Sequence, residues 1–190
     1  MLDEQSIASL DALVGALAAG RVHILSGAPG TGKTAVSLRF IDDGLRRGER
    51  AVLVTSQRPT DLRALAGHLG IEFEMAMAED RLVILRHGRD RTARLSRPGA
   101  LHSAVDELRS LAMPMAPDRL VIDSVAPFLP DDGVPSGVIG RLVEVLEMLD
   151  ATSIVTIPGR LGDSYDRRLE PLVQDAAAVL HLARRAEGIG

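Results

Sequence analysis

The feature that most constrains this chain is a glycine-rich string between a short apolar segment and a helical one. The string reads Gly27, Ala28, Pro29, Gly30, Thr31, Gly32, Lys33 and Thr34. Residues 22–26 before it are apolar enough for a short buried strand, and residues 35–41 after it have helical spacing. A strand, a tight glycine turn and a helix in this order predict an α/β unit.

The chemistry of the string explains its residue types. Glycines let successive backbone N–H groups turn inward around an anion, and the N-terminus of the following helix adds its positive end. Lys33 would reach the terminal phosphates of a nucleotide, and the Thr34 hydroxyl would coordinate Mg²⁺. The whole string is therefore predicted to bind a nucleotide with Mg²⁺. The alternative is a glycine turn that merely joins a strand to a helix.

Lysine usage singles out the same position. The chain has 22 basic residues, and Lys33 is the only lysine among them. Lysine and arginine are usually both tolerated on a solvated surface, but the forked guanidinium of arginine is too bulky for a tight phosphate loop. A single lysine inside the string therefore marks a site that requires a compact ammonium group.

Apolar segments alternate with helical ones along the rest of the chain. Strands are expected near residues 22–26, 51–55, 82–86, 119–123, 152–157 and 177–182. Helices are expected near residues 6–18, 33–47, 60–69, 100–112, 136–149 and 168–175. This alternation predicts an α/β fold with a central, mostly parallel sheet and helices on both faces. With 190 residues, 46% of them hydrophobic and 25% charged, the chain is expected to form one domain over residues 1–190.

A second candidate element is the carboxylate that ends the strand expected at 119–123. Asp123 follows three apolar residues, Leu120, Val121 and Ile122. An unpaired carboxylate at the end of a buried strand is costly unless a cation or hydrogen-bond donors compensate it. Because a phosphate loop also requires a partner for its metal, Asp123 is predicted to hold Mg²⁺ together with Thr34. The alternative is a cap for the loop that follows the strand.

Several strings together resemble the RecA superfamily, and most closely its KaiC-like branch. They are the phosphate loop, the strand 51–55 followed by Ser56-Gln57-Arg58-Pro59, the string 120–125, and Leu10-Asp11-Ala12-Leu13 followed by Gly20-Arg21-Val22. The resemblance extends from about residue 8 to residue 185. It implies a RecA-like fold, with ATP and Mg²⁺ as ligands. It also implies subunits in rings or filaments with the nucleotide at their boundary, so the expected partner is a second copy or another protein.

One departure from the family pattern concerns catalysis. In KaiC-like proteins, two glutamates that activate the attacking water stand where this chain has Ser56 and Gln57. A carboxylate can accept a proton from water, whereas the amide of Gln57 can only orient the water. Hydrolysis is therefore expected to be slow, with Lys33 and Gln57 as the candidate catalytic residues. Four aspartates of neighbouring loops are candidate substitutes for the missing base: Asp131, Asp132, Asp163 and Asp166.

A second departure concerns the C-terminal segment. Family members continue into a hairpin that supplies basic residues to the γ-phosphate of the neighbouring subunit, whereas this sequence ends at Gly190. Arg184 and Arg185 are the candidates for that role here, because a guanidinium stabilises charge that develops during phosphoryl transfer. The alternative is that both arginines are solvated at the end of a strand.

Charge and composition exclude several classes of protein. A formal net charge of −4 and an aromatic content of 2% disfavour general nucleic-acid binding. The exception is the stretch from Arg86 to Arg97, which is either a phosphate or partner contact or simply a solvated loop. The chain has no cysteine, so disulfides and thiolate ligands are excluded. No apolar run reaches the ~18 residues of a membrane span, and a cytoplasmic protein is expected.

Three functions remain compatible with the sequence. The first is a nucleotide-dependent switch or assembly ATPase that binds ATP through Lys33, Thr34 and Asp123 and hydrolyses it slowly. The second is a non-hydrolysing regulator or scaffold on the same fold, which the missing glutamates favour. The third is a small-molecule kinase with residues 86–97 as a lid, for which no acceptor pocket can be named.

Overall fold

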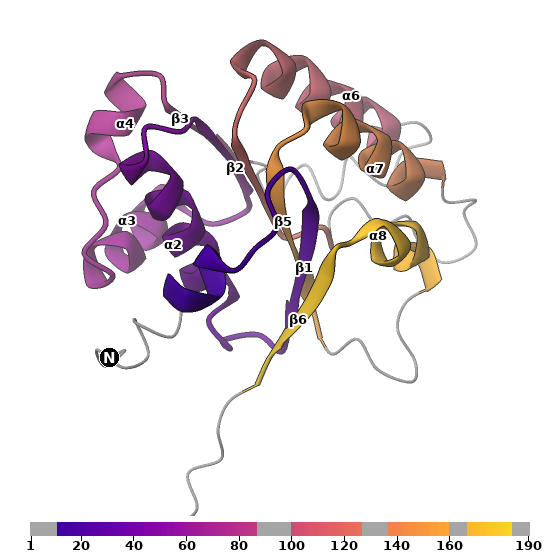
Figure 1. Ribbon diagram of the computed structural model, residues 1–190, viewed down its shortest axis with the longest axis horizontal. Helices are drawn as coiled ribbons and strands as arrows, with labels where there is room; N and C mark the ends of the chain where they lie inside the picture. The colour runs from indigo at the N-terminus through magenta and orange to yellow at the C-terminus, as the bar shows by residue number, and fades with distance from the viewer. Residues whose placement is uncertain (1–10, 87–99, 127–136, 160–166, 184–190) are drawn as a thin grey trace, which may run out of the picture.

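The computed structural model describes residues 11–86, 100–126, 137–159 and 167–183, which form three layers (Figure 1). The strands are β1 (Val22–Gly27), β2 (Ala51–Thr55), β3 (Leu82–Arg86), β4 (Arg119–Asp123), β5 (Thr152–Pro158) and β6 (Ala178–Leu182). The helices are α2 (Lys33–Arg46), α3 (Pro59–His68), α4 (Glu74–Ala78), α6 (Ala100–Ala112), α7 (Gly137–Leu149) and α8 (Glu170–Asp175), with the 3-10 turns η1 (Met113–Met115) and η3 (Arg167–Leu169). Within these ranges no helix combines the length and the apolar character that crossing a bilayer requires.

The strands of the described residues form one parallel sheet. Their order is β3-β2-β4-β5-β1-β6, and every strand pair in it is parallel. This confirms the predicted α/β fold with a central parallel sheet. β1, β2 and β4 are buried along their whole length, which explains their nearly continuous apolar sequences.

Helices cover both faces of the sheet. Figure 1 shows α2, α3 and α4 on one face and α6, α7 and α8 on the other. In β4, Leu120 and Ile122 pack in the cluster that contains α6 and α7, whereas Val121 packs in the cluster that contains α2 and α3. Burial on both faces fixes the register of the strands, because a slip of one residue would exchange the two layers.

The carboxyl ends of the strands gather at the edge of the sheet where the phosphate loop begins. The register places Thr55 of β2 beside Asp123 of β4, and Ile122 beside Val155 of β5. β1 lies next to β5 and ends at Gly27, the first residue of the loop. Parallel α/β sheets bind ligands at this edge, so the topology collects the predicted site residues there.

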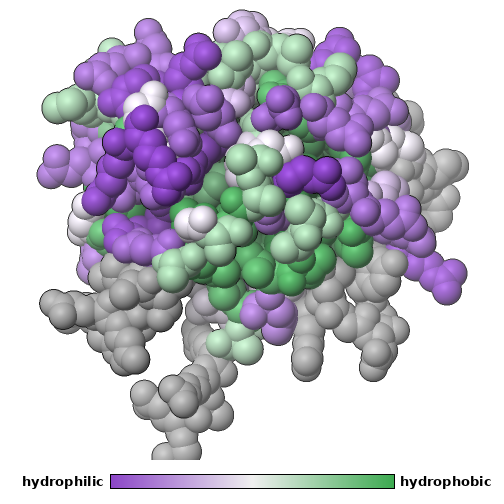
Figure 2. All heavy atoms as spheres, in the orientation of Figure 1, coloured by the Kyte–Doolittle hydropathy of each residue, from purple (hydrophilic) through white to green (hydrophobic). Residues whose placement is uncertain are grey.

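β6 is an edge strand, and among the described strands it pairs with β1 alone. Its side chains alternate between half-buried and exposed, and Val179 is 43% exposed. Figure 2 shows hydrophobic side chains gathered over β6 and α8 on the side of the molecule that faces the viewer. The position of β6 therefore depends on its pairing with β1 more than on burial.

Element boundaries differ from the sequence expectation at three places. The structure adds α4, whose five residues are too few for a helical period to be recognised in the sequence. The helix expected at 168–175 is divided into η3 and α8, because Pro171 can begin a helix but cannot continue one. The helix expected at 6–18 lies partly outside the described residues, and its described part is helical over 11–15.

Candidate functional site

The phosphate loop connects the end of β1 to the first turn of α2 through two positions that require glycine. Gly32, directly before α2, has a φ of 94°. A β-carbon on Gly27 would lie 2.6 Å from the Leu182 carbonyl oxygen and 2.6 Å from Thr31 Oγ1. A side chain would be strained at the first position and would clash at the second. These glycines of the motif therefore have a structural role in this chain.

The N-terminus of α2 is open toward the loop. Its N-cap residue is Gly32, which forms no side-chain hydrogen bond, and its first turn contains no acidic residue. The Lys33 ammonium donates to the carbonyl oxygens of Gly27 at 2.7 Å and of Ala28 at 3.0 Å. The uncapped N–H groups belong to the first turn of α2, and the ammonium belongs to its first residue, Lys33. Both are therefore next to the loop, and both can donate to a phosphate group.

Three side chains meet at the carboxyl end of β4. Thr34 Oγ1 donates to Asp123 Oδ2 at 2.8 Å, and Thr156 Oγ1 donates to Asp123 Oδ1 at 2.7 Å. Asp123 is only 7% exposed, and none of the ion pairs among the described residues involves it. A buried carboxylate beside a hydroxyl, without a cationic side chain, fits Mg²⁺, which prefers oxygen ligands.

Gln57 lies beside Thr34. Its side-chain Nε2 donates to Thr34 Oγ1 at 3.0 Å, and its backbone N–H donates to Thr55 Oγ1 at 3.1 Å. The neighbouring Ser56 is exposed, so of the two residues at the glutamate positions Gln57 is the one that faces the cluster. Its amide leaves a carbonyl oxygen to accept a hydrogen bond from water, but supplies no base at neutral pH.

The structure therefore brings together three residues that the sequence singled out, Thr34, Gln57 and Asp123. Lys33, the fourth, directly precedes Thr34 and bonds to the carbonyl oxygens of the loop. Sequence reasoning missed Thr156, which is fully buried and bonded to the carboxylate. The available signal was a single hydroxyl among the apolar residues near the end of β5. Buried polar side chains need partners, but the sequence alone does not identify Asp123 as the partner, because that contact depends on β5 lying next to β4.

The remaining candidates lie outside the described residues. They are Asp131, Asp132, Asp163, Asp166, Arg184 and Arg185. Of the arginine-rich stretch that begins at Arg86, the structure describes this first residue alone, which is exposed at the end of β3. The roles of all these residues stay predictions from the sequence.

The edge strand β6 supports the start of the loop. The Ser26 hydroxyl donates to the Leu180 carbonyl oxygen at 3.1 Å, and its oxygen lies 3.1 Å from His181 Nδ1. Ser26 is fully buried, so this serine–histidine pair cannot serve as a nucleophile and its base. Because Gly27 also packs against Leu182, the pair helps to hold the first residues of the phosphate loop on β6.

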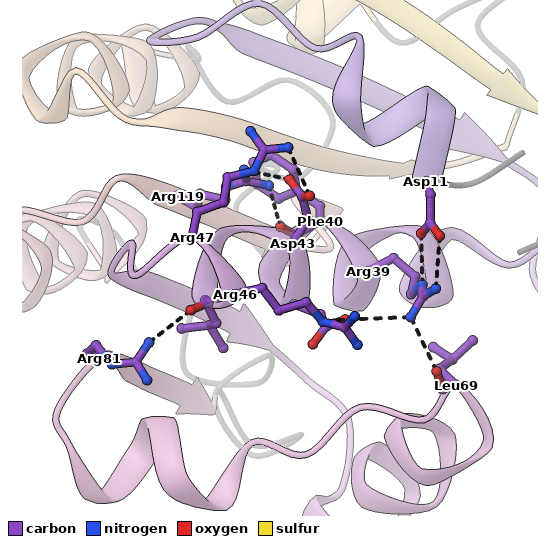
Figure 3. Close-up of polar contacts among 11 residues, drawn as sticks. Asp11, Arg39, Phe40, Asp43, Arg46, Arg47, Leu69, Arg81 and Arg119 are labelled. Carbon is purple, nitrogen blue, oxygen red and sulfur yellow. Dashed lines mark hydrogen bonds and ion pairs between the residues drawn. The ribbon is translucent and has the colours of Figure 1, made fainter. Parts of the chain in front are cut away.

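A buried arginine anchors α2 away from the loop (Figure 3). Arg119 of β4 donates to the Phe40 carbonyl oxygen at 2.6 Å, and its guanidinium lies 4.6 Å from the centre of the Phe40 ring. It also forms ion pairs with Asp43 and Glu49. A β-carbon on Gly44 would run into the Arg119 side chain. The glycine thus allows the arginine to cross directly over the helix.

Two further arginines hold α2 against its neighbours (Figure 3). Arg39 pairs with Asp11 at 3.1 Å and donates to the Leu69 carbonyl oxygen at 3.3 Å, which links α2 to the N-terminal helix and to the end of α3. Arg81 donates to the Leu45 carbonyl oxygen near the end of α2 at 3.1 Å. The helix that carries the phosphate loop is therefore fastened at several points outside the loop itself.

Known proteins are similar to this chain. The family model described as ATPase: KaiC matches residues 4–187. UPF0273 protein PAE3143 of Pyrobaculum aerophilum is 29% identical over 161 residues, which are 80% of this chain and 57% of that protein. The circadian clock oscillator protein KaiC of Nostoc sp. is 30% identical over 152 residues, which are 75% of this chain and 28% of that protein.

A solved structure shares the fold. The KaiC-like protein PH0186 of Pyrococcus horikoshii superposes with a TM-score of 0.71 and 25% identity, over 93% of this chain and 77% of that one. The chain spans little more than half of the UPF0273 protein and less than a third of KaiC. The match to the KaiC model runs along nearly the whole sequence and agrees with the parallel sheet and its loop. This chain therefore belongs to the KaiC family of RecA-type ATPases.

Proposed function

We propose that this chain is an ATP-binding switch or assembly ATPase with slow hydrolysis, acting as a single nucleotide-binding domain. The observation that carries the proposal is the cluster formed by Lys33 on the loop, Thr34 at the start of α2 and Asp123 at the end of β4. An ammonium group, which suits an anion, is here followed directly by a hydroxyl bonded to a carboxylate, which suits a metal. Membership of an ATPase family supports nucleotide binding, and Mg-ATP supplies both the anion and the metal.

Binding requires an exchange of hydrogen bonds at the loop. Lys33 donates to the carbonyl oxygens of Gly27 and Ala28, and phosphate oxygens would take over this ammonium because charge-assisted hydrogen bonds are stronger than neutral ones. The N–H groups at the start of α2 would donate to the same anion.

Thr34 and Asp123 are the residues that would hold Mg²⁺, directly or through water. In the described ranges no group of three or more His, Asp or Glu side chains could hold a metal, so water and phosphate oxygens would complete the coordination, as is common for this ion. When bound, the ion neutralises charge on the phosphates. Thr156 fixes the Asp123 carboxylate so that Oδ2 faces Thr34.

Gln57 is the residue that we assign to positioning the attacking water. The hydrogen bond from its Nε2 to Thr34 orients the amide, and its carbonyl oxygen can accept a hydrogen bond from water. Removing a proton from that water requires a base, which an amide does not provide. Turnover is therefore proposed to be slow, and the ATP-bound and ADP-bound states would be long-lived.

Long-lived states suit a switch or an assembly factor. We propose a second copy of the chain as the partner, because the resemblance to KaiC-like proteins implies a nucleotide at the boundary between subunits. The net charge of −4 gives no reason to propose nucleic acid. The alternative on the same fold is a regulator or scaffold that binds nucleotide without hydrolysis, which an amide in place of a carboxylate at residue 57 favours.

Calorimetric titration of the full chain with Mg-ATP and Mg-ADP, together with phosphate release, tests the proposal. We expect micromolar binding, phosphate release barely above background, and a loss of affinity of about 100-fold or more in Lys33→Ala. Arg46→Ala is the control, because it removes an exposed positive charge from the far end of α2. Equal affinities of Lys33→Ala and the wild type would contradict the assigned site. Binding without any phosphate release would leave the regulator or scaffold.

A further inference from the structure

A pocket of about 610 Å³ lies beside the nucleotide site, between α3, α4 and the carboxyl end of β3. Four buried side chains, Leu62, Ala66, Ile71 and Phe73, line it, and the half-buried Ile84 and the exposed Met77 add to its apolar surface. Pockets that bind small molecules typically have about 300–1,000 Å³ and apolar walls with a few polar groups. This pocket therefore has the size and the character of a small-molecule site.

The charges around the pocket balance. Arg63 and Arg86 contribute two positive charges to the lining, Glu72 and Glu74 contribute two negative ones, and all four side chains are exposed. Among the described residues the lining carries no net charge, which favours neither an anion nor a cation. The half-buried polar side chain in the lining is Gln57, whose amide can both donate and accept a hydrogen bond. The pocket thus suits a neutral molecule with an apolar body and one hydrogen-bonding group.

Gln57 belongs to both the pocket and the nucleotide site. It lines the pocket, and its Nε2 donates to Thr34 Oγ1 at 3.0 Å. An occupant that bonds to the amide would compete for this contact, and a metal or nucleotide that binds at Thr34 would alter the pocket wall. Such coupling between two binding sites is reciprocal by thermodynamic necessity.

We infer that this pocket is an effector site for a small, neutral amphipathic molecule, and that its occupancy changes the affinity of the nucleotide site through Gln57. Burial of the apolar body against the lining supplies the affinity, and the hydrogen bond to the amide sets the orientation. Binding in the pocket is independent of the proposed function, whereas the coupling rests on it.

Two pairs of variants isolate the pocket. Gly67 of α3 lines it, and a β-carbon on Gly67 meets nothing within 4 Å, so Gly67→Phe adds a ring at the wall. Gly140 of α7 has the same open space outside the lining, which makes Gly140→Phe the matched control. In α4, Met77→Lys places a charge in the lining. Met75→Lys is its control, because Met75 lies outside the lining and is 71% exposed.

The probe is N-phenyl-1-naphthylamine, a neutral amphipathic dye that fluoresces in apolar surroundings. We expect the full chain to bind it with micromolar affinity. Gly67→Phe and Met77→Lys should weaken binding about tenfold or more, and the two controls should stay within about twofold. Equal binding by both pocket variants, or no saturable binding by the wild type at about 100 μM dye, would refute the site. So would a change in oligomeric mass in Gly67→Phe without a change in dye binding, which would assign the pocket to a protein contact.

The coupling is measured by repeating the dye titration with saturating Mg-ATP. In the wild type we expect the dissociation constant of the dye to change by about fivefold. Gln57→Ala should bind the dye more weakly, because the hydrogen bond to the amide is lost, and the dissociation constant of the dye should no longer change with Mg-ATP. If calorimetry shows that Mg-ATP does not bind, the proposed function fails and the dye titrations still decide the pocket. If Mg-ATP binds and the dissociation constant of the dye stays constant, the coupling is wrong and the nucleotide site stands.

Discussion

The two ends of α2 are held in opposite ways. At the loop end, Lys33 and Thr34 form hydrogen bonds of 2.7–3.0 Å to carbonyl and carboxylate oxygens on the loop and on β4. Toward the other end, Arg119 and Arg39 form ion pairs with carboxylates and hydrogen bonds to backbone carbonyls (Figure 3). The loop end offers groups that a phosphate and a metal can take over. The other end, which we call the anchored end, holds the helix whether or not a ligand is bound.

This division has a physical reason. A binding site stabilises charge best when its dipoles are already in position, so that ligand binding needs no reorganisation. The N–H groups at the start of α2 can stay in position only if the rest of the helix does not move. Buried charge contacts achieve this, because removing one partner leaves the other charge uncompensated. The contacts at the anchored end therefore keep the N–H groups at the loop end of α2 in position.

The largest effect is expected from breaking the anchored end. Arg119→Ala removes the buried donor to the Phe40 carbonyl oxygen and the partner of the half-buried Asp43 and Glu49. It should lower the free energy of unfolding by about 2–3 kcal/mol, measured by urea denaturation. Arg47→Ala removes an exposed partner of Asp43 and should cost about 0–1 kcal/mol. Lys33→Ala, at the loop end, should also stay within about 1 kcal/mol of the wild type. Comparable losses in all three variants would mean that the two ends do not differ.

The second prediction concerns the chemistry at the loop end. Gln57→Glu restores a carboxylate beside Thr34 and should raise the rate of phosphate release at least about tenfold, equivalent to about 1.4 kcal/mol of activation free energy. Gln57→Ala, which removes the amide without adding a base, should not exceed the wild type. Ser56→Glu tests the neighbouring position. A rise in Ser56→Glu alone would show that the base belongs at the exposed position and not beside Thr34.

The loop end was largely predictable from sequence because its residues are local. The glycines, Lys33 and Thr34 are contiguous, and Asp123 ends an apolar strand whose register with β2 follows from burial on both faces. The anchored end was not predictable. Arg119 looks like an ordinary polar residue at the start of an apolar strand, and its burial depends on Asp43 and Glu49, which only the tertiary fold brings to it.

The same contrast explains the smaller errors. Thr156 reads as one more residue of an apolar strand, and its hydroxyl acquires a role only because β5 lies next to β4. The helix α4 was missed because five residues do not make a periodic pattern. Missing α4 also meant missing the pocket beside Gln57, because this pocket exists only when α4 packs near α3 and β3. Contacts between elements distant in sequence, and not local pattern, decided each of these cases.

A third prediction uses a titratable group at the same edge of the sheet as Arg119. His23 is 2% exposed, its Nε2 accepts a hydrogen bond from the Ala18 backbone N–H at 3.1 Å, and its Nδ1 has no hydrogen-bond partner among the described residues. Burial lowers the pKa of His23 below its ordinary value. Since the unfolded chain then binds the proton more readily, the free energy of unfolding should fall as the pH drops below about 6.5.

Urea denaturation at pH 7.5 and pH 5.5 measures this change. His23→Gln keeps a hydrogen-bond acceptor for Ala18 but cannot titrate, so the difference between the two pH values should shrink in this variant. His68→Gln alters an exposed histidine and should leave the difference as large as in the wild type. An unchanged difference in His23→Gln would assign the acid sensitivity to other groups.

The smallest effect is expected from Thr156→Val, which sharpens the comparison at the loop end. Valine keeps the shape of the buried threonine but removes the hydrogen bond to Asp123 Oδ1, so the carboxylate is less firmly oriented toward Thr34. The Mg²⁺ concentration needed for nucleotide binding should rise about three- to fivefold, measured by calorimetry across a Mg²⁺ series. Ser153→Ala removes another buried hydroxyl from β5, one that bonds to the Ala151 carbonyl oxygen, and should leave this requirement unchanged. Equal shifts in both variants would indicate a general loss of packing in β5. No shift in Thr156→Val would mean that Thr34 alone orients the carboxylate, and that the loop end of α2 needs no support from β5.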